Sequence, residues 1–218
     1  MAIEYAVVVG AAVLLLTVPA LLHRFASGPI GFHDVPPDVY EAVYLFAHMA
    51  PFALFIGYII YLRMGWRHVG MRLDRWRSGL MEGIALGGLI IGVDILWALG
   101  TGEPVTAPVR AHVMWNVALT VLAAFWIVAM VASCTAEEVL RAYVVRRGED
   151  LGWGTPFAAF LSIFLFFSYH TFYIQSVLFI VTLTGGVLLT AYYVFRRNLI
   201  GLIVAHLAAN LGWLATAL

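Results

Sequence analysis

The chain has 218 residues, 63% of them hydrophobic and 11% charged, with a formal net charge of zero. Soluble domains are about half apolar and a quarter charged, so this composition excludes an ordinary soluble protein. It predicts an integral membrane protein surrounded by a lipid bilayer. The balanced charge produces no basic field for nucleic acid, and no nucleic-acid partner is expected. The single cysteine excludes an intramolecular disulfide and a cysteine-based metal site.

Long apolar runs predict the secondary structure. About 20 apolar residues cross a bilayer as a helix, and a helix satisfies its own backbone hydrogen bonds in lipid. The expected fold class is therefore all-α, a polytopic transmembrane helix bundle of about seven to eight helices. The predicted spans are residues 4–23, 41–62, 80–99, 112–134 with a continuation to 147, 155–172, 175–195 and 199–217.

The first apolar run could instead be the core of a secretory signal peptide. It follows Met-Ala-Ile-Glu, which carries no positive charge, and it is longer than a typical signal core. A retained first transmembrane helix is therefore favoured. Because no second polar domain and no long linker interrupts the apolar pattern, we expect a single membrane domain.

Arginine placement predicts the orientation. All basic residues are arginines, and they concentrate in three loops, at residues 63–77, 146–147 and 196–197. These loops fall on one side of the membrane if the predicted spans alternate, and positively charged loops remain in the cytoplasm. The sequence therefore predicts a cytoplasmic N-terminus in a bacterial or archaeal cytoplasmic membrane.

The third span contains Gly83, Gly87, Gly88 and Gly92. They form two small-xxx-small pairs, a spacing that lets helix backbones approach closely. A packing face within the bundle is expected, with a dimer face as the alternative.

Polar side chains inside membrane spans are expensive, and they often mark functional cavities. The first half of the chain contributes His48, Glu82, Asp94 and His112. We expect this first group to pair internally, to face the bundle interior or to lie at the membrane interface. The second half contributes Glu137, Glu138, Arg141, His170, His206 and Asn210.

The adjacent residues Glu137 and Glu138 are the centre of the second group. On a helix, Arg141 lies four residues after Glu137 and three after Glu138, and both spacings bring side chains together. Successive residues point about 100° apart, so one glutamate can pair with Arg141 while the other points into a cavity. An ordinary salt bridge at a helix end is the alternative. Against it, about nine residues of helix separate Glu138 from Arg147, which places the pair deep in the span.

Three further polar residues fall in the last spans. By itself His170, at the end of an apolar run, is more often a packed or interfacial histidine than a catalytic one. His206 and Asn210 are four residues apart and therefore share a helix face. His206 lies about 10–14 Å from the 196–197 loop by helical rise, which is close to the depth of Glu137. The matching depth predicts a shared cavity.

Two glutamates, an arginine, two histidines and an asparagine suit a hydrolytic site. A carboxylate can act as general base on water, and a histidine or asparagine N–H can donate to the oxyanion that forms. A serine nucleophile is less well supported, because neither Ser133 nor Ser168 lies in a Gly-x-Ser-x-Gly pattern. The chain has no His-Glu-x-x-His zinc pattern, although a glutamate and two histidines could bind zinc in principle.

The order of these motifs is similar to that of a known family. Glu-Glu…Arg, then Phe-x-x-x-His, then His-x-x-x-Asn, each in a late hydrophobic span, resembles the CPBP intramembrane proteases. These include the CAAX prenyl endopeptidases and the bacteriocin-processing or immunity proteins, also called the Abi family. The resemblance runs from about Val113 to Leu218. We therefore expect N-terminal helices at residues 1–111 and CPBP-like catalytic helices at 112–218 of one bundle.

The resemblance implies a role for each matching residue. Glu137 matches the proposed activator of the attacking water, and Glu138 matches its neighbour. His170 ends the second motif, and His206 with Asn210 matches the last, whose members position the water and stabilise the oxyanion. The family is described as glutamate-dependent, so the resemblance implies no required cofactor but leaves a divalent metal open.

One departure from the family concerns Arg141. The family pattern is Glu-Glu-x-x-x-Arg, whereas this chain has Glu137-Glu138-Val-Leu-Arg141, which is one residue shorter, with Ala142 at the arginine position. Helical spacing then pairs Arg141 with Glu137. Either the arginine reaches from a neighbouring position, or the two glutamates exchange roles, or the site is degenerate. Which glutamate acts as the base therefore stays open.

The leading hypothesis is an intramembrane endopeptidase. Its expected partner is a peptide or protein substrate with a hydrophobic or lipid-modified segment, and the resemblance implies prenylated C-termini among such substrates. The alternative is a non-catalytic membrane immunity or partner-binding protein of the same fold, which the shifted arginine favours. A transporter is a third class, but the chain shows no repeated halves or paired broken helices.

Overall fold

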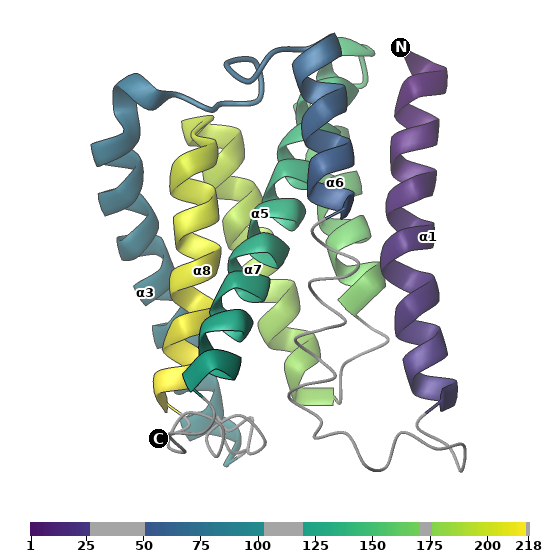
Figure 1. Ribbon diagram of the computed structural model, residues 1–218. Helices are drawn as coiled ribbons and strands as arrows, with labels where there is room; N and C mark the ends of the chain where they lie inside the picture. Colours follow the sequence, from purple (N-terminus) through teal and green to yellow (C-terminus); the bar gives the residue numbers. More distant parts are fainter. Residues whose placement is uncertain (27–50, 103–119, 171–175, 217–218) are drawn as a thin grey trace.

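The computed structural model describes residues 1–26, 51–102, 120–170 and 176–216, which form a bundle of helices (Figure 1). These ranges contain no strand, so the all-α prediction is confirmed. In chain order the elements are α1 (Ala2–Ala26), a helix at Pro51–Arg63, the 3-10 helix η1 (Leu73–Arg75), α3 (Trp76–Thr101), α5 (Thr120–Asp150), α6 (Thr155–His170), α7 (Ser176–Arg196) and α8 (Leu199–Thr216).

Each predicted span falls on one of these helices. The fourth span and its continuation form a single helix, α5, whose 31 residues extend about 46 Å at the usual helical rise. That length exceeds the hydrocarbon core of a bilayer, which is about 30 Å thick. The beginning of the span predicted at 41–62 and the expected boundary at residues 111–112 lie outside the described residues.

One helical stretch among the described residues, Leu73–Thr101, is long and apolar enough to cross a membrane. Shorter apolar helices occur at Ala2–Leu14, Pro51–Arg63, Thr155–Ser168 and Leu199–Leu211. Because the core helix of a soluble protein can meet the same criterion, the membrane assignment depends on the composition of the chain.

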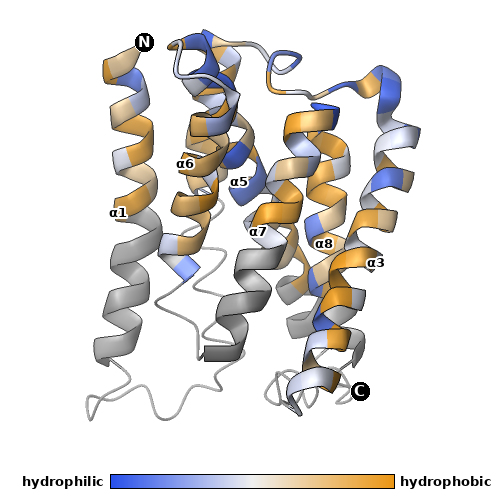
Figure 2. Cartoon of the chain, turned by 180° about the vertical axis from the view of Figure 1, so that it is seen from behind, coloured by the Kyte–Doolittle hydropathy of each residue, from blue (hydrophilic) through white to orange (hydrophobic). Residues whose placement is uncertain are grey.

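The three arginine-rich loops meet at one end of the bundle, where hydrophilic residues gather next to the N-terminus (Figure 2). Arg146 donates a hydrogen bond to the backbone oxygen of His68 at 3.0 Å. Arg197, in the turn between α7 and α8, lies 3.1 Å from Glu149 at the end of α5. The prediction that these loops share one side is therefore confirmed.

The N-terminus lies at the same end. Arg147 Nη2 lies 2.6 Å and 2.7 Å from the two carboxylate oxygens of Glu4, and the Tyr143 hydroxyl donates to Glu4 at 3.2 Å. These contacts attach the beginning of α1 to α5, and they place the N-terminus on the arginine-rich side, as the orientation argument requires.

Glu149 is the carboxylate at the centre of this end. Burial raises the pKa of Glu149, but hydrogen bonds from Arg197 and Thr155 and the charges of Arg197 and Arg146 outweigh burial, so its pKa lies below the usual value. The stability that these contacts contribute is therefore present above the unfolded pKa of the carboxyl, and it is lost as the pH falls through the folded pKa.

The close approach of α3 and α8 explains half of the glycine pattern. A Cβ atom at Gly83 or at Gly87 would lie 2.6 Å from an atom of α8, which is closer than real Cβ contacts come. At Gly88 and Gly92 a Cβ atom would meet no described atom within 4 Å. Packing within the bundle is therefore confirmed for the first glycine pair, and the second pair takes no part in it.

The matched substitutions Gly83→Ala and Gly88→Ala test this packing. Both gain up to about 1 kcal/mol of helix propensity. Gly83→Ala must also push α8 away, and overpacking of this kind costs about 1–3 kcal/mol. We expect Gly83→Ala to lower the thermal unfolding midpoint of the detergent-purified protein, and Gly88→Ala to leave it unchanged or raise it. Equal midpoints for the two variants would contradict the close approach.

The helix α5 lies at the centre of the bundle and contacts α1, α6, α7 and α8. Every residue from 136 to 145 is buried, so this part of α5 is surrounded on all sides. A helix that is buried all round is normally apolar all round. The two glutamates and the arginine in this stretch therefore require partners from the neighbouring helices.

Candidate active site

Glu138 and Arg141 form a buried salt bridge on α5. Arg141 donates from Nε to Oε2 of Glu138 at 2.6 Å and from Nη2 to Oε1 at 3.2 Å, and the two side chains are 0% and 2% exposed. The prediction from spacing that Arg141 pairs with Glu137 is therefore wrong. Residues three apart on a helix share a face as residues four apart do, and the planar guanidinium grips both oxygens of Glu138.

Arg141 also connects α5 to two neighbouring helices. Its Nη1 donates to Thr190 Oγ1 at 2.5 Å and to the backbone oxygen of Gly186 at 3.1 Å, both on α7. Its guanidinium lies 4.4 Å from the centre of the Phe166 ring on α6, which is within the range of a cation–π contact. The side chain is thereby fixed in three directions.

His206 brings α8 to the same carboxylate. Its Nδ1 lies 2.7 Å from Oε1 of Glu138, and because a carboxylate accepts, this nitrogen is the one that carries the proton. Nε2, on the opposite side of the ring, lies 3.9 Å from Oε2 of Glu137. The imidazole therefore stands between the two glutamates.

Glu137 points to both histidines. Its Oε1 accepts a hydrogen bond from Ser133 Oγ at 3.0 Å. Its Oε2 lies 3.9 Å from Nε2 of His170 on α6 and 3.9 Å from Nε2 of His206 on α8. One glutamate thus binds the arginine and the other faces the histidines, which is the division of roles that the 100° separation of adjacent helical residues allows.

The orientation of the His170 ring is fixed by its own helix. Nδ1 lies 2.8 Å from the backbone oxygen of Phe166, and a carbonyl oxygen only accepts, so Nδ1 carries the proton. Nε2 then faces Glu137. The Phe166 ring packs against both imidazoles, with centroid distances of 4.3 Å to His170 and 6.0 Å to His206. The His170 side chain is 25% exposed and Glu137 only 8%, so the site opens on the His170 side.

Asn210 lies next to the turn of α5 that precedes the glutamates. Its Nδ2 donates to Sγ of Cys134 at 3.3 Å. Asn210 shares a face of α8 with His206, as the four-residue spacing predicts. The expected grouping of the two glutamates, Arg141, the two histidines and Asn210 is thus seen in the structure, while their chemical roles stay predictions.

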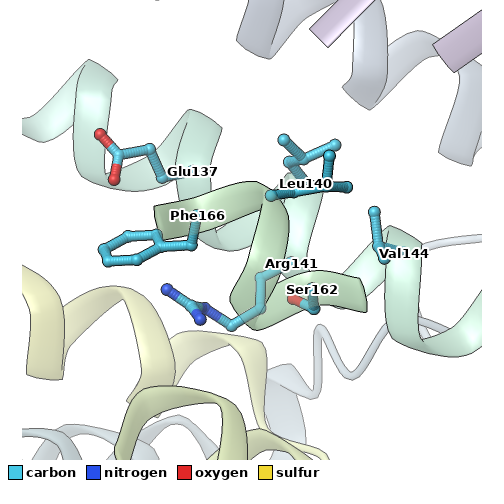
Figure 3. A pocket seen from close by; sticks show the side chains of 7 residues that line it. Glu137, Leu140, Arg141, Val144, Ser162 and Phe166 are labelled. Atoms are coloured by element: carbon cyan, nitrogen blue, oxygen red, sulfur yellow. The ribbon is translucent and has the colours of Figure 1, made fainter. Parts of the chain in front are cut away.

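A narrow pocket between α5 and α6 adjoins this group (Figure 3). The Phe166 ring lies between the Glu137 carboxylate and the Arg141 guanidinium in this view. The pocket has about 10 Å³ of free volume, about the space that one water molecule needs, so it is too small for a peptide. Its lining residues are Glu137, Leu140, Arg141, Val144, Ser162, Leu165 and Phe166.

Of the polar residues predicted in the first half of the chain, the structure describes Glu82 and Asp94. Glu82 on α3 accepts hydrogen bonds from Tyr192 and Arg196 of α7 at 2.9 Å and 3.1 Å. Asp94 faces the bundle interior and is 3% exposed. His48 and His112 lie outside the described residues.

The sequence did not identify four contacts of the site. The hydrogen bond from Ser133 to Glu137 has the four-residue spacing of a helix face, which is a signal that the sequence does contain. The contacts of Thr190 and Phe166 with Arg141 and of Cys134 with Asn210 join different helices, and only the packing of the bundle reveals them.

The need for a metal stays a prediction, and the structure shows which side chains could supply its ligands. Among the described residues, no group of three or more histidines, cysteines, aspartates or glutamates is arranged to hold a metal ion. Glu137, His170 and His206 would be the donors of such a site. Oε2 of Glu137 lies 3.9 Å from Nε2 of each histidine.

Comparison with known proteins identifies this part of the chain. Residues 119–212 match the family model described as "Type II CAAX prenyl endopeptidase Rce1-like". This segment is similar to the Rce1-like family. The match spans α5 to α8, the helices that supply the whole candidate site, and it confirms the resemblance to the CAAX proteases. The Rce1-like family is membrane-embedded, which agrees with the apolar composition of the chain. No curated protein and no solved structure matched the chain.

The salt bridge in the Rce1-like segment is testable by substitution. Arg141→Met leaves the buried Glu138 without its guanidinium, and removal of one partner of a buried pair costs about 3–5 kcal/mol. We expect a large fall in the free energy of unfolding in detergent. Arg196→Met, which breaks the pair with Glu82 at the surface, is the matched control and should change stability little. Equal losses of unfolding free energy in both variants would show that the buried salt bridge contributes no more stability than the surface pair.

Proposed function

We propose that the chain is an intramembrane endopeptidase in which Glu137 activates a water molecule for attack on a peptide bond. The observation that supports this most directly is the position of Oε2 of Glu137, 3.9 Å from Nε2 of both His170 and His206. That distance is too long for a direct hydrogen bond, and polar groups so separated are commonly bridged by water. The family match supports the endopeptidase class.

The first step is the attack of the water. A water bound between Glu137 and His170 transfers a proton to the Glu137 carboxylate as its oxygen bonds to the scissile carbonyl carbon. The lone pair on Nε2 of His170 accepts a hydrogen bond from the other O–H of the water, which keeps this hydrogen, and so orients the water. A tetrahedral oxyanion results. In the second step the proton on Glu137 passes to the leaving nitrogen as the carbon–nitrogen bond breaks, so that a carboxyl and an amine are released.

The oxyanion is stabilised from α8. Since Nδ1–H of His206 donates to the Glu138 carboxylate, the ring can hold a second proton on Nε2 as an imidazolium, and this N–H donates to the oxyanion together with Asn210 Nδ2. Before the attack Glu137 and Glu138 carry two negative charges, and Arg141 and His206 carry two positive ones. After it Glu137 holds the proton of the water, and its negative charge has passed to the oxyanion. The site is neutral overall, as an enclosed group in a membrane protein should be.

This assignment gives the two glutamates different tasks. Glu137 faces the histidines and acts as the base. Glu138 is 0% exposed and is held by Arg141 and His206, so it positions the catalytic imidazole and does not touch the substrate. The shortened motif does not weaken the proposal, because Arg141 still reaches the second glutamate. The argument for a non-catalytic protein therefore loses its main support.

The substrate class follows from the family and from the surroundings. We propose a peptide or protein with a hydrophobic or prenylated segment, cleaved near the arginine-rich, cytoplasmic half of the membrane. The site opens at the partly exposed His170, so the substrate approaches from the α6 side.

Cleavage of a farnesylated peptide with a CAAX C-terminus, by the protein reconstituted in liposomes, tests the proposal. We expect Glu137→Gln to lower kcat by about 10²–10⁴-fold, because a carboxamide cannot accept the proton of the water. Glu82→Gln is the matched control, since Glu82 pairs with Arg196 outside the site, and should retain the wild-type rate. If Glu137→Gln cleaves as fast as the wild type, the site assignment is wrong. A wild-type protein that cleaves neither prenylated nor unmodified hydrophobic peptides would favour the non-catalytic alternative.

Metal dependence is tested on the same assay. We propose that no metal is required, because a carboxylate and a histidine suffice to activate water. Dialysis against a strong chelator should then leave the cleavage rate unchanged. Loss of activity on dialysis, with recovery on addition of zinc, would contradict a glutamate-only mechanism.

A further inference from the structure

We infer that Ser133 is a positioning residue for the proposed hydrolysis, holding the Glu137 carboxylate so that Oε2 faces both histidines. This inference rests on the proposed role of Glu137 as the base. Ser133 Oγ donates to Oε1 of Glu137 at 3.0 Å. Because Ser133 binds one oxygen of the carboxylate, the other is the one directed to Nε2 of His170 and His206, each 3.9 Å away.

The contact is local and enclosed. Ser133 precedes Glu137 by four residues, so the two side chains share a face of α5, and they are 7% and 8% exposed. Water is therefore a poor substitute for the hydroxyl, and removal of the hydroxyl removes a donor to a buried carboxylate.

The direction of this hydrogen bond differs from the usual one. A serine inside a helix usually donates backwards to the carbonyl oxygen four residues earlier. Ser168 in α6 does so, with its Oγ 2.7 Å from the backbone oxygen of Phe164. Ser133 instead donates forward to a side chain, which gives the hydroxyl a task beyond the satisfaction of its own hydrogen bond.

Fixing the carboxylate matters because its last torsion is soft. The terminal torsion of a glutamate has no sharp preferred angles, so the chain alone does not decide which oxygen faces the histidines. A general base must lie within hydrogen-bond reach of the proton that it removes. A shift of about 1 Å in a catalytic group can cost about a hundredfold in rate. The hydrogen bond from Ser133 therefore helps to set how often Glu137 is oriented for reaction.

The test is the peptide cleavage assay on the full-length protein with Ser133→Ala and Ser133→Thr. Ser133→Ala should lower kcat about tenfold with KM unchanged, because the substrate still binds while the base is misoriented. Ser133→Thr keeps the hydroxyl and should restore most of the rate. Ser78→Ala is the control: Ser78 lies on α3, and its Oγ donates to the backbone oxygen of Arg75 outside the site, so this variant should keep the wild-type kcat.

The outcomes separate this inference from the proposed function. If Ser133→Ala cleaves at the wild-type rate while Glu137→Gln is inactive, the positioning role is wrong and the proposed function stands. If Glu137→Gln itself cleaves normally, the proposed function fails. A loss in Ser133→Ala that threonine does not restore, that appears in KM alone, or that Ser78→Ala reproduces would indicate general damage to the fold and overturn the inference.

The two residues can also be compared without a substrate. Unfolding of Ser133→Ala, Glu137→Ala and the double variant in detergent forms a double-mutant cycle. We expect the double variant to lose less stability than the sum of the single losses, since each single change removes the same hydrogen bond. Additive losses would show that the two side chains are not coupled and would overturn the inference.

Discussion

The buried carboxylate of Glu138 is the constraint on which the rest of the site depends. An ionised carboxylate taken out of water without partners is far more costly than a whole domain is stable. Arg141 and His206 supply those partners from α5 and α8. The same arginine reaches Thr190 on α7. The burial of one charge therefore fixes three helices relative to one another, and the position of His206 is a consequence of it.

The orientation of Glu137 follows from the contacts of Glu138. Because Glu138 already holds the arginine, Glu137 faces the histidines and Ser133 instead. The aromatic ring of Phe166 separates the two arrangements: the guanidinium lies against it, and both imidazoles pack around it. The interior of the bundle thus holds one structural ion pair and one carboxylate that faces the partly exposed His170. Because the two adjacent glutamates have different partners, they do not compete for the guanidinium of Arg141.

The helices were predictable because composition decides them. In a chain this apolar each span must satisfy its own backbone hydrogen bonds, which a helix does. The loops that carry arginine separate the spans clearly. The grouping of the site was also predictable, since the depth of Glu137 matches that of His206 and both histidines follow in late spans. The partner of Arg141 could not be predicted, because residues three and four apart on a helix are both neighbours. Which of the two glutamates pairs with Arg141 depends on contacts with the surrounding helices. The contact of Glu4 with Arg147 joins residues that are far apart in the sequence, and no local sequence pattern predicts it.

The most direct test of the account is an experimental structure of the protein in lipid at a resolution that shows ordered water. We expect a water within about 3 Å of Oε2 of Glu137 and of Nε2 of His170, with Glu138 bound by Arg141 and His206. A structure in which Glu138, in place of Glu137, faces Nε2 of His170, or in which His170 points to lipid, would contradict this arrangement.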